Sequence, residues 1–408
     1  MRRVVVTGIG LLSPLGLSLE ETVDSVFEGN CGIKVIEEWA EYKGFRAPIG
    51  APLPDFDFPD YFDRKATRSM GRGALLAAYA SIKALEHSGL DRSFLKGNPR
   101  VGVAYGSGTG SPEALKDFSR FIFEKSTRGI KATTYLRSMG HTCAANLGVF
   151  LGLSGRIVPT SSACSSGSLA VGNAYELIRS GQQDLMIAGG AEELDASIAV
   201  IFEALYASSS GKNAPEKSSR PFDKNRDGLV TGEGACSFIL EDFEHAIARG
   251  AKPLAEVVGF ATNSGGEHMT QQSKDSIEQC LRLSLADAEL EKEKIGYLSA
   301  HATGTPHGDI SESHATASVF GNSVAVSSFK GHLGHSLGGS GSTSAALSIE
   351  MMNREKFCPT LNLEQPDSDC AELDYIVGEC RNIDTEYVMS NNFAFGGINT
   401  SLILKRAR

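Results

Sequence analysis

The sequence predicts an α/β fold in which helices cover central sheets, and two observations support this prediction. Short runs rich in β-branched residues recur along the chain, mostly bounded by glycine or polar turns, as is typical of buried strands. Between many of these runs lie segments whose apolar residues follow helical spacing. This alternation disfavours all-β and all-α folds and favours layers of helices packed on sheets.

The expected elements follow one another from the N-terminus to the end of the chain. Strands are predicted over residues 3–7, 100–104, 156–159, 184–188, 236–240, 254–260, 295–299, 324–328 and 401–404. Helices are predicted over residues 73–87, 168–180, 276–290, 310–320 and 343–353. Residues 212–226 are polar and are expected to form a loop. No Pro/Ser-rich linker interrupts the chain, so we expect its domains to share a large interface.

Length and composition limit the classes of protein to which the chain can belong. Its 408 residues suffice for two or three units of ~100–200 residues, and 41% hydrophobic with 22% charged residues is a globular composition. Glycine, at 45 residues, exceeds the usual ~7%, which predicts tight turns or closely packed backbones. A net charge of −10 disfavours broad binding to nucleic acid or anionic lipid, although it leaves room for a local basic patch.

The cysteines and the N-terminus indicate a cytoplasmic protein with reduced thiols. The eight cysteines are Cys31, Cys143, Cys164, Cys236, Cys280, Cys358, Cys370 and Cys380. They include no C-x-x-C pair and no regular spacing, which argues against a zinc ribbon or a disulfide framework. The apolar run after Met1 is too short for a signal peptide, and no apolar stretch reaches the roughly 18 residues of a membrane span.

The first candidate for chemistry is Cys164, in the segment TSSACSSGS at residues 160–168. An expected strand ends just before this segment, and an expected helix begins at Ser168. Unpaired N–H groups and the dipole at a helix N-terminus stabilise a thiolate, so we expect a lowered thiol pKa and a nucleophilic Cys164. The alternative is an inert buried cysteine, the commoner fate of this residue type, but the strand-to-helix position favours the nucleophile.

Two further polar turns carry histidines. His301 lies in SAHATGTPHGD at residues 299–309, at the C-terminal end of an expected strand, where α/β folds place their working groups. The segment SSFKGHLGHSLGG at residues 327–339 contains His332 and His335. Together with a cysteine these turns suggest acyl chemistry. A metal site is the weaker alternative, because His332 and His335 lack the H-E-x-x-H frame and a carboxylate on the same turn.

Two other motifs have a structural and a functional interpretation. The segment DKNRDG at residues 223–228 matches the opening of a calcium loop, but its twelfth position is Gly234 and Arg226 adds positive charge, which predicts a salt-bridged turn instead. The segment MSNNFAFGGINT at residues 389–400 places glycines beside two aromatic residues. Such a turn can present backbone N–H groups to a ligand under a closing ring, or it can be a tight turn between two core phenylalanines.

In this order and at these separations, the four segments resemble the β-ketoacyl-[acyl-carrier-protein] synthases of the I/II type, which have the thiolase fold. The likeness covers essentially the whole chain, from VVVTGIG at residues 4–10 through GSGTG at 106–110 and RPFD at 220–223 to the final FAFGG turn. It implies two similar halves in a five-layered α-β-α-β-α arrangement and a homodimer. Residues 1–250 would hold the nucleophile Cys164, and residues 251–408 would hold His301 and His335.

The resemblance also implies a reaction and the residues that perform it. An acyl chain passes from an acyl carrier protein to Cys164 and is condensed with malonyl carrier protein, with loss of CO2, to give a chain two carbons longer for fatty acid biosynthesis. His301 and His335 stabilise the enolate, while Lys330 and Glu312 match the family's lysine and its supporting glutamate. The oxyanion hole is assigned to the N–H groups of Cys164 and Phe395, and the Phe395 ring to a gate. Neither a metal nor another cofactor is implied, because phosphopantetheine arrives on the carrier protein.

By the same resemblance, substrate and partner contacts fall on further residues. Thr303 and Thr305 match hydroxyls that bind the pantetheine arm, and Thr109 and Met139 lie where the acyl pocket would end. The positions that resemble carrier-protein contacts are Arg64, Lys65, Arg68, Arg128 and Lys131. For each of these basic residues an ordinary solvated surface charge is an equally good interpretation.

The chain departs from the family pattern at two places. Ala302 replaces a glycine, at a cost of roughly 1 kcal/mol if that position needs a positive φ. Residues 329–332 read FKGH where Thr-Lys-Ser-Met-Thr is common. These changes leave open a second interpretation, a ketosynthase of a specialised polyene or polyketide-like pathway, with or without a chain-length-factor partner. Cys164 and both histidines argue against a non-catalytic chain-length factor or a scaffold, and the absence of a cysteine from the final turn argues against a thiolase.

Overall fold

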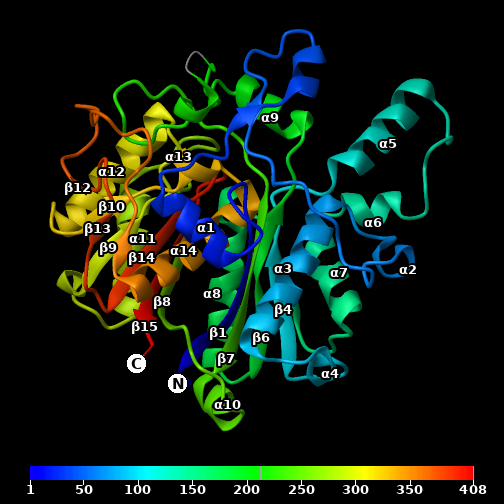
Figure 1. Cartoon of the computed structure of the whole chain (residues 1–408), viewed down its shortest axis with the longest axis horizontal. Helices are drawn as coiled ribbons and strands as arrows, with labels where there is room; N and C mark the ends of the chain where they lie inside the picture. The colour runs from blue at the N-terminus through cyan, green and yellow to red at the C-terminus, as the bar shows by residue number, and fades with distance from the viewer. Residues whose placement is uncertain (212–213, 408) are drawn as a thin grey trace.

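The computed structural model describes residues 1–211 and 214–407, and its strands and helices alternate along the chain (Figure 1). The strands are β1 (Val4–Leu12), β2 (Lys34–Val35), β3 (Ile49–Gly50), β4 (Val101–Gly106), β5 (Ile157–Thr160), β6 (Leu185–Glu192), β7 (Gly234–Asp242), β8 (Ala255–Ser264), β9 (Ile295–Ser299), β10 (Ala325–Ser327), β11 (Lys356–Phe357), β12 (Asp374–Tyr375), β13 (Arg381–Asn382), β14 (Tyr387–Phe393) and β15 (Ile398–Arg406).

The helices lie between these strands. They are α1 (Leu19–Phe27), α2 (Arg64–Thr67), α3 (Arg72–Ser88), α4 (Arg92–Leu95), α5 (Pro112–Glu124), α6 (Thr134–Ser138), α7 (Thr142–Leu151), α8 (Ser166–Arg179), α9 (Ala196–Ala204), α10 (Phe243–Ala248), α11 (Lys274–Asp287), α12 (Pro306–Phe320), α13 (Lys330–Leu333) and α14 (Ser340–Arg354). Short 3₁₀ turns are η1 (Glu37–Glu41), η2 (Ala163–Ser165), η3 (Pro215–Lys217), η4 (Lys292–Lys294) and η5 (Leu337–Gly339).

Every strand and helix expected from the sequence is present, with its ends shifted by a few residues. Two residues of the expected loop at 212–226, Lys212 and Asn213, lie outside the described residues, and the remainder holds only η3 and turns. Strand β14 was not predicted as a strand, because its residues were interpreted as part of the turn before β15. The elements that were also not predicted are helices α1, α2, α4, α5, α6, α7, α9, α10 and α13 and the two-residue strands β2, β3, β11, β12 and β13.

The two halves of the chain repeat one strand order. The main sheet runs β12-β10-β9-β14-β15-β8-β1-β7-β6-β4-β5. Its first-half strands β1-β7-β6-β4-β5 are joined by antiparallel, antiparallel, parallel and parallel pairs, and β8-β15-β14-β9-β10 repeat that pattern. Strands β1 and β8 join the halves through the pairs from Val4↔Val257 to Val6↔Ala255. The predicted pair of similar halves is therefore observed.

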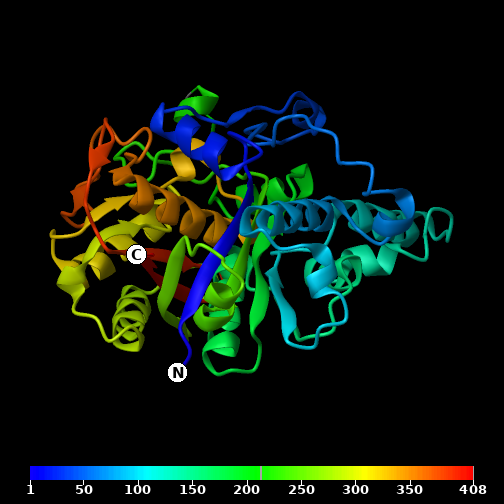
Figure 2. The same ribbon diagram turned by 60° about the horizontal axis from the view of Figure 1, so that its bottom comes forward.

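Five layers result from the way the helices cover the two halves of the sheet (Figures 1 and 2). Helices α8 and α14 pack against each other in the centre, α3 and α7 cover one outer face, and α11 and α12 cover the other. Helix α14 fits between the sheets because its first ten residues, SGSTSAALSI, are small or aliphatic and nearly all buried. The expected division after residue 250 stays a prediction; that position lies in the connection between α10 and β8.

The fold brings the chemically interesting turns to one end of the sheets. Strands β5, β9 and β10 belong to the parallel parts of the two halves, so their C-terminal ends lie on the same side of the sheet within each half. Cys164 follows β5, His301 follows β9, and Lys330 and His335 follow β10. Within the described residues, no helix has the length and apolar character needed to cross a bilayer.

Candidate active site

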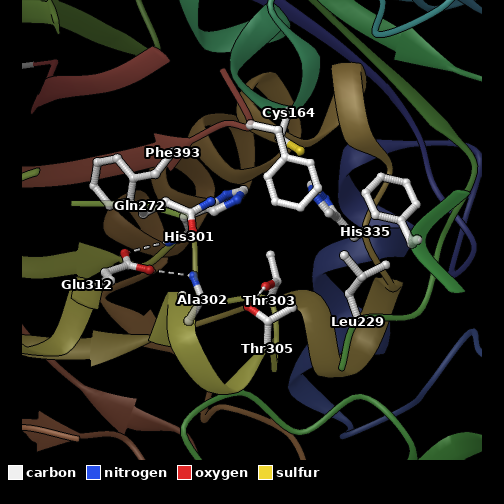
Figure 3. Close-up of a pocket in the computed structure, with 13 residues that line it drawn as sticks. Cys164, Leu229, Gln272, His301, Ala302, Thr303, Thr305, Glu312, His335 and Phe393 are labelled. Carbon is white, nitrogen blue, oxygen red and sulfur yellow. Dashed lines mark hydrogen bonds between the residues drawn. The ribbon is translucent and has the colours of Figure 1, made fainter. Parts of the chain in front are cut away.

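A cavity at the meeting of the two halves contains most of the predicted catalytic residues (Figure 3). Its lining is Cys164, Phe202 and Leu229 from the first half, and Gln272, His301, Ala302, Thr303, Thr305, Gly308, Glu312, His335, Phe393 and Phe395 from the second. The sulfur of Cys164 and one ring nitrogen each of His301 and His335 lie within 4.8 Å of one another. Three residues more than 30 positions apart in the sequence thus meet at one point.

Cys164 occupies a tight turn between β5 and α8. It lies in η2 and is 6% exposed, and the preceding Ala163 has φ +49°, a left-handed conformation that is uncommon for a residue with a side chain. Neighbouring serines hold the turn: Ser166 donates through Oγ to the Ala163 carbonyl at 2.7 Å, and its Oγ accepts from Ser162 N–H at 2.9 Å. The strand-to-helix position predicted for Cys164 is therefore confirmed.

The predicted lowering of the thiol pKa is wrong for this structure. Burial, with a further contribution from the Glu192 carboxylate, raises the pKa of Cys164 to about 12. Lys330 and the backbone N–H groups of Cys164 and Phe395 act in the opposite direction and lower this pKa. A helix N-terminus alone cannot offset the loss of water from a cysteine enclosed by side chains from distant segments.

His301 is held from its backbone by acidic residues of helix α12. Glu312 accepts from the N–H groups of His301 and Ala302 at 2.8 and 2.6 Å (Figure 3). Asp309 accepts from those of Thr303 and Gly304 at 3.0 and 3.1 Å. The backbone at Ala302 lies outside the left-handed region. The alanine therefore carries no strain there, and its methyl group simply lines the cavity.

His335 presents an imidazole that the surrounding protein does not bind. Its backbone N–H donates to the Val230 carbonyl at 2.7 Å, whereas neither ring nitrogen has a hydrogen-bond partner among the described residues. Its ring centroid lies 5.3 Å from that of His301. Burial, and secondly the nearby Lys330, lowers the pKa of His335 well below its ordinary value, so the ring is neutral near pH 7.

Lys330 and Glu312 form the charged surroundings of the two imidazoles. Lys330 is 3% exposed, and burial lowers its pKa to about 8 despite the opposing effect of Glu312. Burial likewise raises the pKa of Glu312 to about 8. Lys330 also lowers the pKa values of both histidines, so it favours their neutral forms.

The final glycine turn closes the cavity as one of its two interpretations predicted. Phe395 lines the cavity and packs on Phe202 at a centroid distance of 6.0 Å, while Gly396 and Gly397 take φ values of +87° and +72°. A residue with a side chain would be strained at those two positions. Phe393 also lines the cavity and contacts the His301 ring at a centroid distance of 6.2 Å.

The expected substrate residues are only partly brought together. Thr303 and Thr305 line the cavity, and their hydroxyl oxygens are 3.0 Å apart. Thr109 instead donates to Glu192 at 3.3 Å, and Met139, at the end of α6, is half-buried. In the part of the chain that the structure describes, neither residue lines the catalytic cavity, because the loop after β4 turns towards Glu192.

Four of the five expected carrier contacts share one groove. Its basic residues are Arg64, Lys65, Arg68, Arg72, Lys131 and Arg137. Arg137 is paired with Glu113 at 3.2 Å and Arg72 with Glu233, so the positive charge of the groove comes from Arg64, Lys65, Arg68 and Lys131. Arg128 lies outside the groove on the exposed loop between α5 and α6, so the structure does not group it with the others.

The residues of the metal and calcium alternatives have other partners in the structure. His332 does not join His335: its ring nitrogens face the Asn30 carbonyl at 2.9 Å and the Pro359 carbonyl at 3.4 Å. In the calcium-like segment, Asp223 pairs with Arg220 at 3.0 Å and Arg226 lies 3.5 Å from Asp309. The predicted salt-bridged turn is therefore confirmed, and all eight cysteines are free.

Several residues of the site were not found from the sequence. Phe202, Leu229 and Gln272 line the cavity, but no local motif marks them. Glu192 did carry a signal, an acidic residue at the end of the apolar strand LMIAGGAE, and it accepts from Gly108 N–H at 2.6 Å and Gly338 N–H at 3.2 Å. Asn392 lies within a quoted motif, yet its contact with His301 depends on the pairing of β14 with β9.

Comparison with known sequences shows that the chain is similar to β-ketoacyl synthases over its whole length. Residues 1–246 match the family profile described as Beta-ketoacyl synthase, N-terminal domain, and residues 254–364 match Beta-ketoacyl synthase, C-terminal domain. The chain is 38% identical to 3-oxoacyl-[acyl-carrier-protein] synthase 2 of Vibrio cholerae over 413 residues, which cover 99% of each chain. It is 35% identical to 3-oxoacyl-[acyl-carrier-protein] synthase 1 of Escherichia coli over 415 residues, covering 100% of both.

Solved structures agree over the whole chain. A beta-ketoacyl synthase from Burkholderia phymatum superimposes with a TM-score of 0.98 at 47% identity, covering 100% of both chains. The ishigamide ketosynthase/chain length factor gives 0.90 at 29% identity, with the same coverage. A ketosynthase described in complex with its type II polyketide synthase acyl-carrier protein gives 0.89 at 27% identity, again with full coverage.

Proposed function

The chain belongs to the β-ketoacyl synthase family, and from this premise we propose how its site performs the condensing reaction. It has the thiolase fold, with two similar halves in five layers, and it is an acyltransferase of fatty acid elongation, a 3-oxoacyl-[acyl-carrier-protein] synthase. The observation that carries the proposal for the site is the meeting of one cysteine and two neutral imidazoles within 4.8 Å in a buried cavity.

In the first half-reaction Cys164 takes the acyl chain from the carrier protein. The sulfur attacks the carbonyl carbon of the acyl thioester, and the carrier's thiol leaves with the proton that the cysteine loses. The N–H groups of Cys164 and Phe395 lower the pKa of the Cys164 thiol and so favour negative charge at this point, and we assign them to the oxyanion formed beside the sulfur. Burial raises the thiol pKa, so the cysteine is protonated in the free enzyme. We expect it to lose its proton only as the sulfur attacks the substrate, because the negative charge then moves to the carbonyl oxygen of the thioester.

In the second half-reaction the two histidines assist decarboxylation. The malonyl thioester loses CO2, and the electron pair of the broken C–C bond moves into the thioester as an enolate. Ring N–H groups of His301 and His335 donate to the enolate oxygen, a role for which neutral imidazoles with free nitrogens are suited. The carbanion then attacks the acyl group on Cys164, the sulfur leaves and regains a proton, and a 3-oxoacyl chain two carbons longer remains on the carrier.

Lys330 and Glu312 prepare the histidines for this step. The positive charge of Lys330 favours neutral rings, and Glu312 fixes the backbone from which the His301 ring projects. Thr303 and Thr305 line the cavity with adjacent hydroxyl groups and are assigned to the pantetheine arm. Acyl transfer with loss of CO2 involves no net oxidation, so we expect neither a metal nor a redox cofactor, and a cytoplasmic location stays a prediction.

The carrier protein is the expected partner at the basic groove. One related ketosynthase structure contains an acyl-carrier protein. A basic groove attracts an acidic partner by electrostatic complementarity even though the chain as a whole carries −10. Arg64, Lys65, Arg68 and Lys131 are assigned to this contact. The roles expected for Arg128, Thr109 and Met139 stay predictions from the family resemblance.

A homodimer would cover the free edge of the sheet. Strand β5 is the last strand at one edge of the described sheet, and Ile157 on it is 46% exposed. Val149 on the neighbouring helix α7 is 82% exposed, and Phe123 at the end of α5 is 84% exposed. We propose that a second copy of the chain covers this surface, which light scattering on the purified protein will test.

A second candidate function is a ketosynthase of a polyene or polyketide-like pathway with a chain-length-factor partner. It is favoured by the full-length likeness to the ishigamide ketosynthase/chain length factor at 29% identity. The two candidates share the reaction and differ in the acyl donor and in the second subunit. The acyl donor preference therefore distinguishes them.

The test is incubation with malonyl carrier protein and a panel of acyl carrier proteins, saturated and polyunsaturated, with products identified by mass spectrometry. We expect an acyl adduct on Cys164 and a 3-oxo product two carbons longer, both absent with Cys164→Ala. Preference for saturated donors supports fatty acid elongation, and preference for polyunsaturated donors supports the second candidate. Absence of loading and of CO2 release with every donor would contradict both.

A further inference from the structure

Among the described residues, the His301 ring has one hydrogen-bond partner, the side chain of Asn392. His301 Nδ1 lies 3.2 Å from Asn392 Oδ1, and Asn392 is fully buried on β14. The other end of this amide, Nδ2, has no hydrogen-bond partner among the described residues. Rotation of the amide by half a turn would exchange its two ends within the same space, so hydrogen bonding to the rest of the protein does not choose between them.

The two amide orientations impose opposite tautomers on His301. A neutral imidazole carries one N–H group and one bare nitrogen. If Oδ1 of Asn392 faces the ring, the hydrogen lies on Nδ1 and Nε2 is bare. If Nδ2 faces the ring, it donates to Nδ1, and the hydrogen lies on Nε2, the nitrogen that remains for a substrate.

The charge state of His301 does not settle this choice. His301 is 5% exposed, and burial, together with Lys330 and His335, lowers its pKa well below the ordinary value. The ring is therefore neutral near pH 7 and can donate from Nε2 in only one of its two tautomers. Glu312 contacts the His301 backbone N–H and not the ring, so it cannot select the tautomer.

We propose that Asn392 is a positioning residue that sets the tautomer of His301, with its Nδ2 donating to Nδ1 so that Nε2–H faces the enolate oxygen during decarboxylation. The proposal rests on the function assigned above. It gives Asn392 no contact with the substrate, because Asn392 acts only through the imidazole. Acyl loading of Cys164, which uses the backbone N–H groups, is independent of it.

The neighbouring Asn391 provides a matched control. It is the same residue type on the same strand and is also fully buried, and both ends of its amide lack a partner in the described part of the chain. Successive side chains of a strand point to opposite faces, so Asn391 points away from the face that Asn392 shares with His301. Leucine is similar in size to asparagine, so either substitution removes the amide while the space it occupied stays filled.

The experiment compares Asn392→Leu, Asn392→Ser and Asn391→Leu with the wild-type enzyme in separate assays of acyl loading and of malonyl carrier protein decarboxylation. We expect Asn392→Leu to load Cys164 normally and to decarboxylate about 10- to 100-fold more slowly. The shorter side chain of Asn392→Ser leaves room for a water molecule that its hydroxyl can hold against Nδ1, so this variant should keep more of the rate than Asn392→Leu. Asn391→Leu should behave as wild type in both assays, with thermal unfolding confirming that each variant is folded.

Two readouts separate a tautomer effect from a structural one. In enzyme labelled with ¹⁵N-histidine and bound to a non-hydrolysable malonyl thioester, the wild-type His301 signals should show protonated Nε2, and Asn392→Leu should not show this preference. Asn392→Asp offers only acceptors, and its carboxylate raises the pKa of His301 by stabilising the ring that is protonated on both nitrogens. Decarboxylation by this variant relative to wild type should therefore rise as the pH falls from 8 to 6. Lys330, His335 and Cys164 also face this ring, and the ratio to wild type removes their titration.

Outcomes that overturn the proposal are distinct from those that overturn the function. Decarboxylation at the wild-type rate in folded Asn392→Leu, or an equal loss of loading and decarboxylation, would show that Asn392 does not set the tautomer. A wild-type enzyme that neither loads an acyl group nor releases CO2 would instead contradict the condensing function.

Discussion

The two halves of this molecule repeat one topology, yet they use the same connections for different chemistry. The connection from β5 to α8 carries the nucleophile Cys164, and the equivalent connection from β10 to α14 carries Lys330 and His335. The loop after β4 holds Ser107 to Thr109, and the loop after the equivalent β9 holds His301. The difference teaches that the repeated scaffold fixes where a functional group is placed, while the residue there decides what it does.

Each half also gathers backbone N–H groups on a buried glutamate, but the two acids do so differently. Glu312 binds the loop of its own half, at His301 and Ala302. Glu192 binds Gly108 of its own half and Gly338 of the other. Glu192 therefore ties the halves together beside Cys164, whereas Glu312 shapes one loop.

The largest expected effect divides the work between the halves. Cys164→Ala should reduce condensation by at least about 10³-fold, because no acyl group can be held, while malonyl decarboxylation by the second half continues. His335→Ala should do the reverse, with loading intact and decarboxylation reduced about 10²- to 10³-fold by the loss of a donor. Mass spectrometry of the loaded enzyme and CO2 release measure the two activities separately. Loss of both activities in either folded variant would contradict this division.

A smaller effect concerns the glutamate that joins the halves. Burial raises the pKa of Glu192 to about 7, so the folded state binds this proton more tightly than the unfolded state does. Stability should therefore fall as the pH rises from about 4.5 to 7, by up to roughly 3 kcal/mol from this group, and then level off. Thermal unfolding across this range measures the slope.

The control for that slope is Glu192→Gln. The amide cannot ionise, so the variant should lose this contribution to the pH dependence. It should also be less stable than wild type at low pH by about 1 kcal/mol, because its NH2 group takes the place of Oε1, which accepts from the hydroxyls of Ser107 and Thr109, while its oxygen can keep the N–H groups of Gly108 and Gly338 that Oε2 accepts. An unchanged slope in the variant would assign the pH dependence to other groups.

The smallest effect compares one alanine in each half. Ala163, before the nucleophile, has φ +49°, whereas Ala302, after the histidine, lies outside the left-handed region. Ala163→Gly relieves a strain of about 1–2 kcal/mol, and Ala302→Gly relieves none, although both pay the same entropy in the unfolded chain. The first variant should therefore be more stable than the second by about 1–2 kcal/mol in denaturant unfolding. Equal stabilities would mean that the turn at Ala163 relaxes without strain.

Much of the fold was predictable because buried strands are recognisable in the sequence as short apolar runs. Runs such as β1 and β5 are apolar and rich in β-branched residues, and the turns after β5, β9 and β10 contain the cysteine and histidines that the site uses. Strand β14 escaped prediction because Ser390, Asn391 and Asn392 interrupt its apolar pattern. Those polar residues are buried because β14 lies between β9 and β15, with layers of helices on both faces, which no local pattern can show.

The identity of the catalytic residues was predictable, but their electrostatics were not. Local sequence placed Cys164 at a turn before a helix, and that was correct. Its pKa depends on enclosure by Leu229, Phe395 and other distant side chains, so the expected shift had the wrong sign. Asn392 illustrates the same limit, because its contact with His301 joins segments 91 positions apart.

The place of β1 in the sheet also constrains how the chain is made. This first strand pairs with β7, from Leu12↔Ala235 to Val4↔Asp242, and with β8 through Val4 to Val6. Its partners therefore leave the ribosome more than 220 residues later, which at ~5–20 residues per second is roughly 10–45 s. During that interval β1 has no native strand partner, and α3 is the main element packed on it that is made earlier. Strand β1 therefore completes its pairing only after most of the chain that follows it has been made, and protection of its apolar residues during translation is a requirement that the topology itself creates.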